Sequence, residues 1–533
     1  MVQVRQHGAI GAAAGHAAAS RCDVLVVGGG INGAGIARDL AGRGLKVVLC
    51  EQHDLASHTS SASTKLIHGG LRYLEHYEFS LVRKALAERE VLLKSAPHIM
   101  WPLRFVMPHD PSMRPVWMIR AGLFLYDHLA KRELLPGSET VRLLEHPAGA
   151  PLQPQFTRGF VYSDGWVDDA RLVVLNAVDA AERGAVVHTR CRCEQAQRQA
   201  DGWQATLAHA DGRREVLQAR MLVNAAGPWA AQFLHQQVGL RQGKGLRLVK
   251  GSHIVVRQRF RHPFAYIFQN PDKRIIFAIP YEGEFTLIGT TDVEYTGGLG
   301  EVRISDDEVR YLCEQASRYF AQPVQPADVV WTYSGVRPLL EDEAADASAV
   351  TRDYLLEQDS SAAPLLSVWG GKITTFRKLA EEAADAVCRQ LGHTARPWTE
   401  RSFLPGGDLS RWVSQPGHPE QDMQRFAQAL QQQQPQVSPA VLQRWARCYG
   451  ARVQLLLDAG LGEQIVPGVY EAELHYLRQH EFARELNDVL WRRTKLGLHL
   501  DAAAQATLAD WWQRHPLPAA QPRNAINTEN AWS

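Results

Sequence analysis

The chain has 533 residues, 45% of them hydrophobic and 22% charged, and a formal net charge of +1. This length is too great for one small hydrophobic core, so two or more domains are expected. The near-zero net charge removes the case for nucleic-acid binding on charge alone, and any basic site has to be local. The 7 cysteines are scattered and lack a second pair at zinc-binding spacing, which favours reduced, intracellular thiols and predicts no metal site.

No stretch of the sequence approaches the roughly 18 uninterrupted apolar residues of a membrane-spanning helix. Residues 1–20 are rich in Ala and Gly but contain no strongly hydrophobic core, so they are interpreted as a flexible extension and not as a secretory signal. Residues 114–132 mix Trp, Phe, Leu and Ile with Arg and Lys, a pattern typical of a helix on anionic lipid. A buried helix with charged residues where it leaves the interior explains the same pattern equally well. The sequence therefore predicts a protein that is soluble or attached to a membrane surface.

Residues 22–51 carry the most specific pattern in the chain. An apolar run leads into Gly28, Gly30 and Gly33, and a second apolar run ends at Glu51. This order of strand, glycine turn, helix, strand and acid is the fingerprint of a dinucleotide-binding unit. The helix N-terminus offers N–H groups and a positive dipole end to phosphates, and the glutamate can accept a hydrogen bond from a ribose hydroxyl. The alternative is a glycine-rich turn without a ligand.

Further helices and strands are expected up to residue 223. Residues 98–120 contain several prolines and are expected to be irregular. A helix capped by Asp is expected at 164–177, a strand at 185–188, and a hairpin followed by a strand at 203–223. An amphipathic helix is expected at 80–94, with one face formed by Leu81, Ala85, Leu86 and Leu93.

The second half of the chain changes character twice. Residues 246–293 alternate polar with apolar and aromatic residues, which predicts a mostly antiparallel sheet separate from the nucleotide fold. Residues 365–387 return to strand, glycine turn and helix, a unit that could also close over a cofactor. Residues 397–409 resemble a linker, and residues 421–512, rich in Gln, Leu, Ala and Arg, predict a helical domain. Residues 519–533 are polar and are predicted to be disordered.

Four cations stand in turn-like settings, next to glycine, proline, threonine or aromatic residues. They are Arg72, Arg337, Arg352 and Lys372. Surface cations usually form helix-face pairs with an acid three or four residues away, and these do not follow that pattern. Brought together, they would form a pocket for a small dianion, because guanidinium groups match phosphate oxygens and a lysine adds a point charge. The alternative is a set of arginines that only stabilise turns.

Two histidines and one strand end complete the candidates. His253 stands in a strand between glycine-marked strands, where it could take a hydroxyl proton near neutral pH or serve as a hydrogen-bonded structural residue. His68 precedes a glycine turn and is expected to fix it beside the cofactor. The small residues Ala226 and Gly227 end another strand and would let backbone approach a ligand. Nucleophile-elbow and P-loop patterns are absent from the sequence, which disfavours a hydrolase or an NTPase.

The order of these motifs resembles that of the aerobic, FAD-dependent glycerol-3-phosphate dehydrogenases, members of the D-amino-acid-oxidase-like flavoprotein superfamily. The resemblance covers residues 22–405 and continues more weakly through 486–498. It rests on the segments GGGINGAGIARDLAGRGLKVVLCE, TSSASTKLIHGGLRYLEHYEF, GLFLYDHL, YSDGWVDDARL, NAAGPW, KGSHIVV, IGTTDVEY, WTYSGVRPL, TRDY and GGKITTFRKLAE.

The resemblance implies oxidation of sn-glycerol 3-phosphate to dihydroxyacetone phosphate by hydride transfer to FAD, with the electrons passed to membrane quinone and the respiratory chain. It also implies peripheral attachment at the cytoplasmic face of the inner membrane, and a homodimer is a further expectation. An oxidase that passes the electrons of the same substrate to oxygen is the closest alternative. More distant alternatives are a flavoenzyme acting on an amino acid or another hydroxy acid, and a flavin-binding regulator without catalysis.

By the same resemblance, individual residues acquire expected roles. The substrate-binding residues would be Arg72, Tyr73, Arg352 and Lys372. His253 and Arg337 would lie nearest the reacting carbinol, and which of them removes the hydroxyl proton stays open. The FAD-binding residues would be Gly28, Gly30, Gly33, Glu51, Ser60, Ser61, Thr64, His68, Gly69, Ala226, Gly227, Gly371 and Thr374.

The expected fold class is α/β, with a Rossmann-like FAD-binding domain, an antiparallel-sheet substrate domain and a C-terminal α-helical domain. In the helical domain, Arg492 and Arg493 are interpreted as part of a solvated helix face, and a role of this domain in dimerisation or regulation stays open. The expected boundaries are a flexible extension at 1–20, the FAD-binding domain at 21–95, 160–245 and 350–395, the substrate-binding domain at 96–159 and 246–349, a linker at 396–410, the helical domain at 411–518 and a disordered tail at 519–533.

Overall fold

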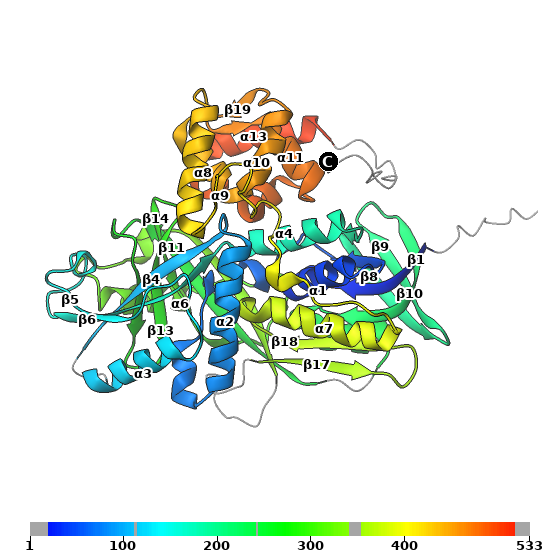
Figure 1. The fold of residues 1–533 in the computed structure, drawn as a ribbon, viewed down its shortest axis with the longest axis horizontal. Coiled ribbons are helices and arrows are strands. Elements are labelled where there is room, and N and C mark those ends of the chain that lie inside the picture. The colour runs from blue at the N-terminus through cyan, green and yellow to red at the C-terminus, as the bar shows by residue number, and fades with distance from the viewer. Residues whose placement is uncertain (1–19, 111–113, 241–243, 341–352, 517–533) are drawn as a thin grey trace, which may run out of the picture.

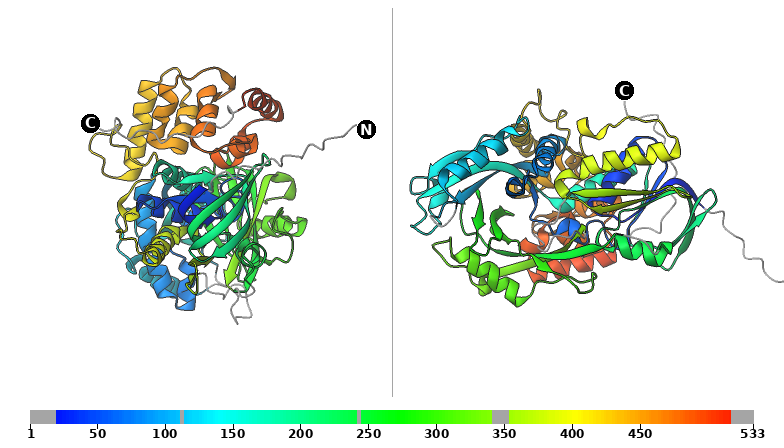
Figure 2. Two further views of the ribbon diagram at one scale, coloured as in Figure 1. Left: turned by 90° about the vertical axis from the view of Figure 1, so that its right-hand side faces the viewer. Right: turned by 90° about the horizontal axis from the view of Figure 1, so that it is seen from below.

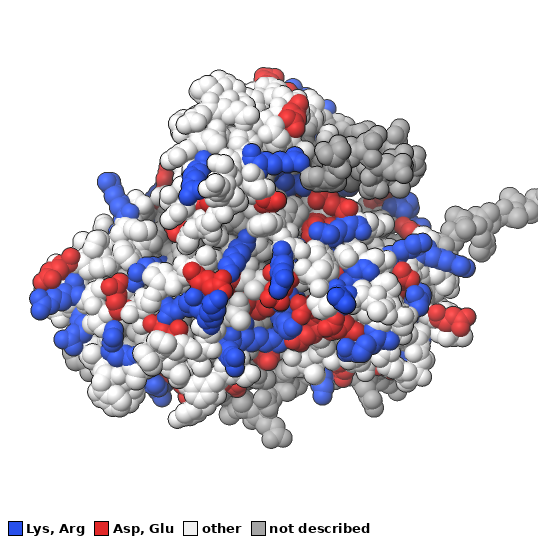
Figure 3. Space-filling model, viewed as in Figure 1, with Lys and Arg blue, Asp and Glu red and all other residues white. Residues whose placement is uncertain are grey.

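The computed structural model describes residues 20–110, 114–240, 244–340 and 353–516. Two sheets with flanking helices form the body of the molecule, and a helical C-terminal domain lies on one side of it (Figures 1 and 2). Acidic and basic side chains are interspersed over the face that Figure 3 shows, in keeping with the net charge of +1. Within the described ranges, no helix is both long and apolar enough to cross a membrane.

The first sheet has eight strands among the described residues, in the order β17-β18-β10-β1-β2-β7 with β9 beside β10 and β8 beside β9. The pairs β18–β10, β10–β1, β1–β2 and β2–β7 are parallel, as in a Rossmann-like fold, which confirms the expected architecture. Its strands are β1 (Ser20–Val27), β2 (Val47–Cys50), β7 (Val186–His188), β8 (Cys191–Gln199), β9 (Gly202–His209), β10 (Arg214–Asn224), β17 (Tyr354–Asp359) and β18 (Leu365–Gly370).

Three helices form the layer over this sheet. Helix α1 (Ile31–Gly42) lies between α4 (Asp169–Glu182) and α7 (Phe376–Leu391) and contacts both (Figure 1). Apolar residues from α1 and α7 share one buried cluster with strands β1, β2, β10 and β18. This packing fixes the N-terminal end of α1 against the carboxyl ends of the parallel strands, where ligands bind in such folds.

The second sheet has ten strands among the described residues, and every neighbouring pair except β12–β4 is antiparallel. This confirms the expected antiparallel sheet. Helix α6 (Asp306–Ser317) packs its buried residues against β11, β13 and β14. The strands are β3 (Leu66–Ile67), β4 (Met100–Pro108), β5 (Glu139–Arg142), β6 (Arg158–Val167), β11 (Leu246–Arg257), β12 (Ala265–Gln269), β13 (Ile275–Tyr281), β14 (Phe285–Gly289), β15 (Val293–Glu294) and β16 (Val329–Leu340).

The two longest strands of this sheet, β11 and β16, bring His253 and Arg337 to one face. In the antiparallel register, His253 pairs with Tyr333 and Val249 pairs with Arg337. Side chains opposite each other in an antiparallel pair point to the same face, and residues two or four apart along one strand share that face. Gly335 lies between Tyr333 and Arg337 on this face, and the loop that follows β2 packs on it, since a Cβ at Gly335 would lie 2.7 Å from Ala62 Cβ.

Several local predictions are confirmed. Helix α2 (Phe79–Ser95) covers the predicted amphipathic segment, and all four residues of its predicted apolar face are buried. Strand β7 lies where a strand was expected, and β9 and β10 form the predicted hairpin. These elements were recognisable because their hydrophobic periods and turn residues are local properties of the chain.

Two local predictions are wrong. The segment 98–120 is not irregular, because β4 crosses it and α3 (Val116–His128) follows, with the prolines of β4 near its two ends. The helix expected from residue 164 starts only at Asp169, capped by Asp168, whose carboxylate accepts a hydrogen bond from Arg171 N at 3.2 Å. Residues 164–167 instead complete β6, because β4 and β3 pair with them. Pairing with distant strands overrode the local turn signal there.

The C-terminal domain has its own hydrophobic core, drawn from residues 409–512. The segment that joins it to the body is docked, because Trp398 packs against Gly42 of α1 and its ring lies 3.9 Å from the Arg183 guanidinium. The helices of this domain are α8 (Pro419–Gln433), α9 (Pro439–Tyr449), α10 (Val453–Asp458), α11 (Glu471–His480), α12 (Leu496–His499) and α13 (Ala502–Arg514), with a hairpin of β19 (Gln464–Val466) and β20 (Val469–Tyr470).

The interpretation of Arg492 and Arg493 as a solvated helix face is wrong. The side chains are 18% and 0% exposed, respectively, and both form ion pairs with Asp54 of the body. They belong to the π-helical turn Asp488–Arg493, which lies against the loop after β2. Nothing in the local sequence distinguishes this arrangement from a surface pair, because the partner is more than 430 residues away.

Candidate functional site

Two of the three fingerprint glycines, Gly28 and Gly33, occupy positions that only glycine can fill. Gly28 has a φ of +111°, and a Cβ there would lie 2.4 Å from the Ala225 carbonyl oxygen. A Cβ at Gly33 would lie 1.9 Å from the Gly28 carbonyl oxygen, so helix α1 packs directly on the turn. The turn after β1 therefore has the geometry that the fingerprint predicts.

The N-terminus of α1 faces the same place. Gly30 is the N-cap residue and offers no side chain to the first turn. Ser60, from the loop after β2, instead accepts a hydrogen bond from Ile31 N at 3.0 Å. Asn32 follows in the first turn and donates to the Gly370 carbonyl oxygen at 3.2 Å, which ties the helix start to the turn after β18. A helix N-terminus in this position is suited to a pyrophosphate.

Glu51 stands at the end of β2 in a fixed orientation. Its two carboxylate oxygens accept hydrogen bonds from Gly29 N and His53 N, each at 2.7 Å. Burial raises its pKa, and these two N–H groups oppose that rise. The carboxylate is thus held at the edge of the site with remaining acceptor capacity, as recognition of a ribose hydroxyl requires.

A cavity of about 410 Å³ opens between these elements. Besides the fingerprint turn, residues 191–193 and Trp229 line it at the side of Glu51, and Pro338 lines it at the side of β16. Of the predicted FAD-binding residues, seven line the cavity: Gly28, Gly30, Glu51, Ser60, Ala226, Gly227 and Gly371. The remaining six are not part of the lining: Gly33, Ser61, Thr64, His68, Gly69 and Thr374.

The loop carrying Ser60, Ser61 and Thr64 is held from behind by a buried ion pair that sequence reasoning missed. Lys65 Nζ lies 2.6 Å from Asp169 Oδ1 and donates to the Ser61 carbonyl oxygen at 3.1 Å. The run of small hydroxyl residues before Lys65 was a visible signal. The acid partner was not, because it lies 104 residues further along the chain.

The turn with His68 and Gly69 is anchored between the two sheets. His68 N donates to Thr374 Oγ1 at 3.2 Å, so this turn meets the segment before α7. Gly69 N donates to Tyr126 Oη at 2.9 Å and to Asp164 Oδ1 at 3.2 Å. These hydrogen bonds join the turn to the segment before α7, to α3 and to β6.

Lys372 and Arg337 are the two predicted cationic residues whose side chains the structure describes. Lys372 Nζ lies 3.8 Å from the centre of the Tyr73 ring. Arg337 Nη2 lies 2.6 Å from Asp292 Oδ1 and donates to the Thr291 carbonyl oxygen at 3.1 Å. The chain neighbours of Lys372 and Arg337, Gly371 and Pro338, both line the cavity.

The other two predicted cations are Arg72 and Arg352. Arg72 belongs to the 3-10 helix Leu71–His76 together with Tyr73, but its side chain is not among those that the structure describes. Arg352 lies outside the described residues. The following residue, Asp353, is near the turn after β18, since a Cβ at Gly370 would lie 3.1 Å from the Asp353 carbonyl oxygen.

His253 is buried on β11 between the sheet and the loop after β2. Its ring stacks on Tyr333, with ring centres 4.6 Å apart, and its Nε2 lies 3.0 Å from Thr64 Oγ1. Burial, and then the charges of Lys65 and Arg337, lower its pKa well below the ordinary 6.5. The imidazole is therefore neutral at pH 7 and able to accept a proton.

A second set of buried polar residues, also missed from the sequence, supports the segment that binds Arg337. Glu308 of α6 pairs with Lys250 Nζ at 2.8 Å and accepts hydrogen bonds from Thr291 Oγ1 at 2.8 Å and Ser252 Oγ at 2.9 Å. Because Thr291 in turn accepts from Arg337, this group fixes the strand end that holds the guanidinium.

The residues present fit a flavin dinucleotide. Glycines whose Cβ positions are filled by backbone, a helix N-terminus with glycine as its N-cap residue and an oriented glutamate lie along one cavity. That cavity continues to glycines 370 and 371, the residues directly before Lys372 in the sequence. Among the described residues, no cluster of three or more His, Cys, Asp or Glu side chains could hold a metal ion.

Comparison with known families finds two matches along the chain. Residues 23–377 match the family of FAD dependent oxidoreductases, and residues 397–510 match the C-terminal domain of alpha-glycerophosphate oxidase. A glycerol-3-phosphate dehydrogenase of Pseudomonas aeruginosa is 52% identical over 502 residues, which cover 93% of this chain and 96% of the relative. A D-erythritol 1-phosphate dehydrogenase of Brucella abortus is 47% identical over 505 residues, covering 93% of this chain and 99% of the relative.

A solved structure shows the same architecture over almost the whole chain. The glycerol-3-phosphate dehydrogenase from Bacillus halodurans, complexed with FAD, matches with a TM-score of 0.74 and 27% sequence identity. The match covers 93% of this chain and 90% of that chain.

Proposed function

The chain belongs to the family of FAD-dependent oxidoreductases, within its branch of glycerol-3-phosphate dehydrogenases, and from this membership we propose that it oxidises sn-glycerol 3-phosphate to dihydroxyacetone phosphate. Its cofactor is FAD. FAD can accept two electrons at once and release them one at a time. It can therefore link the oxidation of an alcohol to the reduction of a quinone. In the complete reaction, the substrate loses a hydride from C2 and a proton from its hydroxyl, and a membrane quinone gains two electrons and two protons.

The observation that supports this proposal is the position of two cations, Lys372 and Arg337, next in sequence to residues that line the FAD cavity. Lys372 lies in the turn after β18 and Arg337 lies in β16, and each directly follows or precedes a residue that lines the cavity. In a chain of net charge +1, such a local group is suited to a phosphate dianion. We assign Arg72 and Arg352, whose motifs adjoin the same segments, to the same phosphate.

For the hydroxyl proton we propose His253 as the acceptor. A guanidinium cannot lose its proton in a protein, so Arg337 cannot act as a base. The neutral imidazole of His253 can, and its hydrogen bond with Thr64 and its stacking on Tyr333 fix the ring. Arg337 then contributes positive charge that stabilises the oxygen as it loses its proton.

A second substrate is favoured by one comparison. The 47% identity to a D-erythritol 1-phosphate dehydrogenase is close to the 52% identity to a glycerol-3-phosphate dehydrogenase. Both names describe a secondary alcohol on a short phosphorylated polyol, so the same cations would serve either substrate. We propose glycerol 3-phosphate as the better substrate and a four-carbon polyol phosphate as the alternative.

The decisive experiment is anaerobic mixing of the purified, FAD-loaded protein with each phosphorylated polyol while the visible spectrum is followed. We expect glycerol 3-phosphate to bleach the flavin absorbance, and unphosphorylated glycerol to leave it unchanged. Faster bleaching by D-erythritol 1-phosphate would move the assignment to that substrate, and no bleaching by either would refute the proposed reaction. Turnover with a soluble quinone analogue, compared with turnover on oxygen alone, separates a dehydrogenase from an oxidase.

For the membrane quinone we propose an approach over α3. This helix exposes Trp117 and Phe124, at 67% and 64%, and the neighbouring Tyr77 is 80% exposed. The helix lies at the margin of the body away from the C-terminal domain (Figure 1) and contacts the 3-10 helix that holds Tyr73. Exposed aromatic residues accompanied by Arg114 and Lys131 suit peripheral attachment to anionic lipid, at the cytoplasmic face of the inner membrane.

A further inference from the structure

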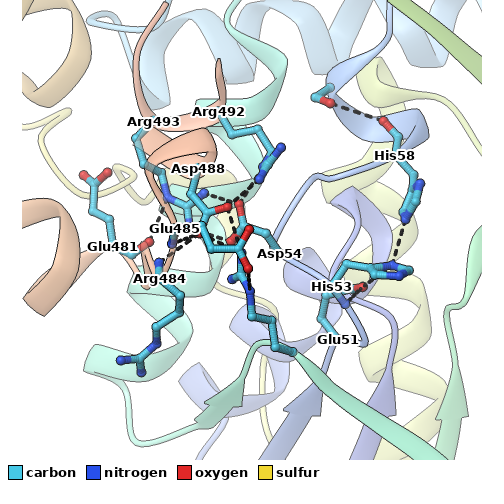
Figure 4. A network of polar contacts seen from close by, with 12 residues as sticks. Glu51, His53, Asp54, His58, Glu481, Arg484, Glu485, Asp488, Arg492 and Arg493 are labelled. Atoms are coloured by element: carbon cyan, nitrogen blue, oxygen red, sulfur yellow. Dashed lines mark hydrogen bonds and ion pairs between the residues drawn. The ribbon is translucent and has the colours of Figure 1, made fainter. Parts of the chain in front are cut away.

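The turn Asp488–Arg493 of the C-terminal domain forms buried ion pairs with the loop that follows β2. Arg493 forms a bidentate ion pair with Asp54, at 2.6 Å to Oδ2 and 2.8 Å to Oδ1. Arg492 Nε reaches the same Asp54 Oδ2 at 2.6 Å. The Arg493 and Asp54 side chains are 0% and 1% exposed, so this contact is shielded from water and from salt (Figure 4).

The same turn also forms an ion pair with Arg190, directly before β8. Asp488 Oδ1 lies 3.0 Å from Arg190 Nη2 and 2.5 Å from Arg492 Nη2, so this buried carboxylate lies between the two arginines. Glu485 pairs with Arg190 Nε at 2.9 Å. Three acids and three arginines, drawn from three segments, thus neutralise one another in one network: Asp54, Glu485, Asp488, Arg190, Arg492 and Arg493.

Both segments that the turn holds belong to the wall of the FAD cavity at the side of Glu51. Asp54 is three residues after Glu51, and Arg190 directly precedes the lining segment 191–193. The two segments are also tied to each other, because Arg190 N donates to the His53 carbonyl oxygen and Cys191 N to the Glu51 carbonyl oxygen, each at 2.7 Å. Any displacement of Asp54 or Arg190 would therefore move the glutamate that we assign to the ribose.

From these contacts we infer that the turn Asp488–Arg493 is a positioning element of the FAD site, through which the C-terminal domain sets the affinity for the adenosine half of the cofactor. Arg493, Arg492 and Asp488 themselves lie outside the cavity lining. They act through Asp54 and Arg190, and the C-terminal domain thereby acquires a role that its sequence did not indicate.

The test measures FAD binding separately from folding. Full-length protein freed of FAD is titrated with FAD and with ADP, and its thermal unfolding midpoint is measured without ligand. We expect Asp54→Asn and Arg493→Gln each to weaken both FAD and ADP binding by about 5- to 150-fold, the range typical of coupled sites. The double variant should be little weaker than Asp54→Asn alone, because Arg493→Gln removes a contact that Asp54→Asn has already broken.

A matched control comes from a second buried ion pair between the same two domains. Arg171 of α4 and Glu481 form a bidentate pair, with exposed fractions of 1% and 0%, and neither residue lines the FAD cavity. Glu481 contacts Arg493 through its backbone carbonyl oxygen, which Glu481→Gln leaves in place. Glu481→Gln should lower the unfolding midpoint as Arg493→Gln does, yet leave FAD and ADP affinity within about twofold. Equal losses of affinity in both variants would overturn the inference, because the effect would then follow global stability alone.

A milder pair of variants covers the case in which the buried changes prevent folding. Arg492 is 18% exposed and Arg452, which pairs with Glu182 of α4 at 2.6 Å, is 13% exposed. Arg492→Gln should weaken ADP binding measurably, whereas Arg452→Gln should not. Unchanged ADP affinity in Arg492→Gln, with correct folding, would also overturn the inference.

Discussion

His253 owes its chemical state to its surroundings on β11. Burial removes water from the ring, and Lys65 and Arg337 place positive charge near it, so its pKa falls well below 6.5. A histidine of lowered pKa stays neutral as the pH falls through 6.5. It therefore stays uncharged in a range where an exposed histidine would be protonated.

We expect His253→Gln to lower turnover by about 10²- to 10⁴-fold, the usual contribution of a general base. The bound FAD content should stay that of the wild type. Turnover and flavin absorbance of the purified variant check this. His262→Gln, a change at a histidine that contacts Tyr266 elsewhere in the same sheet, serves as the control. Unchanged turnover in His253→Gln would remove this residue from the role.

The surroundings of helix α3 decide between two interpretations of its sequence. Its sequence suited either a membrane surface or a buried helix. In the structure, Leu123 and Tyr126 are the buried residues of α3, whereas Trp117, Met118, Phe124 and Leu125 are exposed. Apolar residues gathered on one exposed helix favour a lipid surface, since scattered single residues would need no explanation.

We expect the double substitution Trp117→Glu and Phe124→Glu to reduce binding to vesicles containing anionic lipid by about tenfold or more, because two aromatic anchors are lost and negative charge is added. Cosedimentation with the vesicles measures this. Turnover with a soluble quinone analogue should stay unchanged. Leu455→Glu, at an exposed position of α10 in the C-terminal domain, is the control, and wild-type binding by the double variant would contradict the proposed surface.

Across the whole molecule, buried ionic and polar groups join the C-terminal domain to the body. His98 is one of them, fully buried next to Gly406 and Gly450. Burial, and then the charges of Arg171, Arg447 and Arg452, lower its pKa to about 3. The unfolded chain binds a proton on this histidine near pH 6.5, whereas the folded chain does so only near pH 3. The stability that neutral His98 contributes is therefore present above pH 6.5 and is lost as the pH falls below it.

This loss amounts to about 1.4 kcal/mol per pH unit for one proton. Between pH 7 and pH 5, we therefore expect the free energy of unfolding of His98→Asn to fall by about 2 kcal/mol less than that of the wild type. Urea unfolding at the two pH values measures the difference. His235→Asn, at an exposed site, should follow the wild type, and an identical pH dependence in His98→Asn would contradict this linkage.

Features that depend on a few neighbouring residues could be predicted from the sequence. The fingerprint turn, helix α2 and the hairpin of β9 and β10 were foreseen, because turn residues and hydrophobic periods act over a few residues. The family, the cofactor FAD and the fold class were foreseen from linked motifs. Strand β4 and the start of α4 were missed, since their pairing partners lie elsewhere in the chain.

By itself, then, the sequence determined the chemistry that the protein holds: a dinucleotide turn, a set of cations and a histidine on a strand. Only the tertiary structure decided what supports them. Lys65 with Asp169, and Arg493 with Asp54, are buried pairs separated by 104 and 439 residues. A lysine or arginine has the same local sequence whether it faces water or a distant carboxylate, and the difference arises only when folding removes the water and brings the partner into contact.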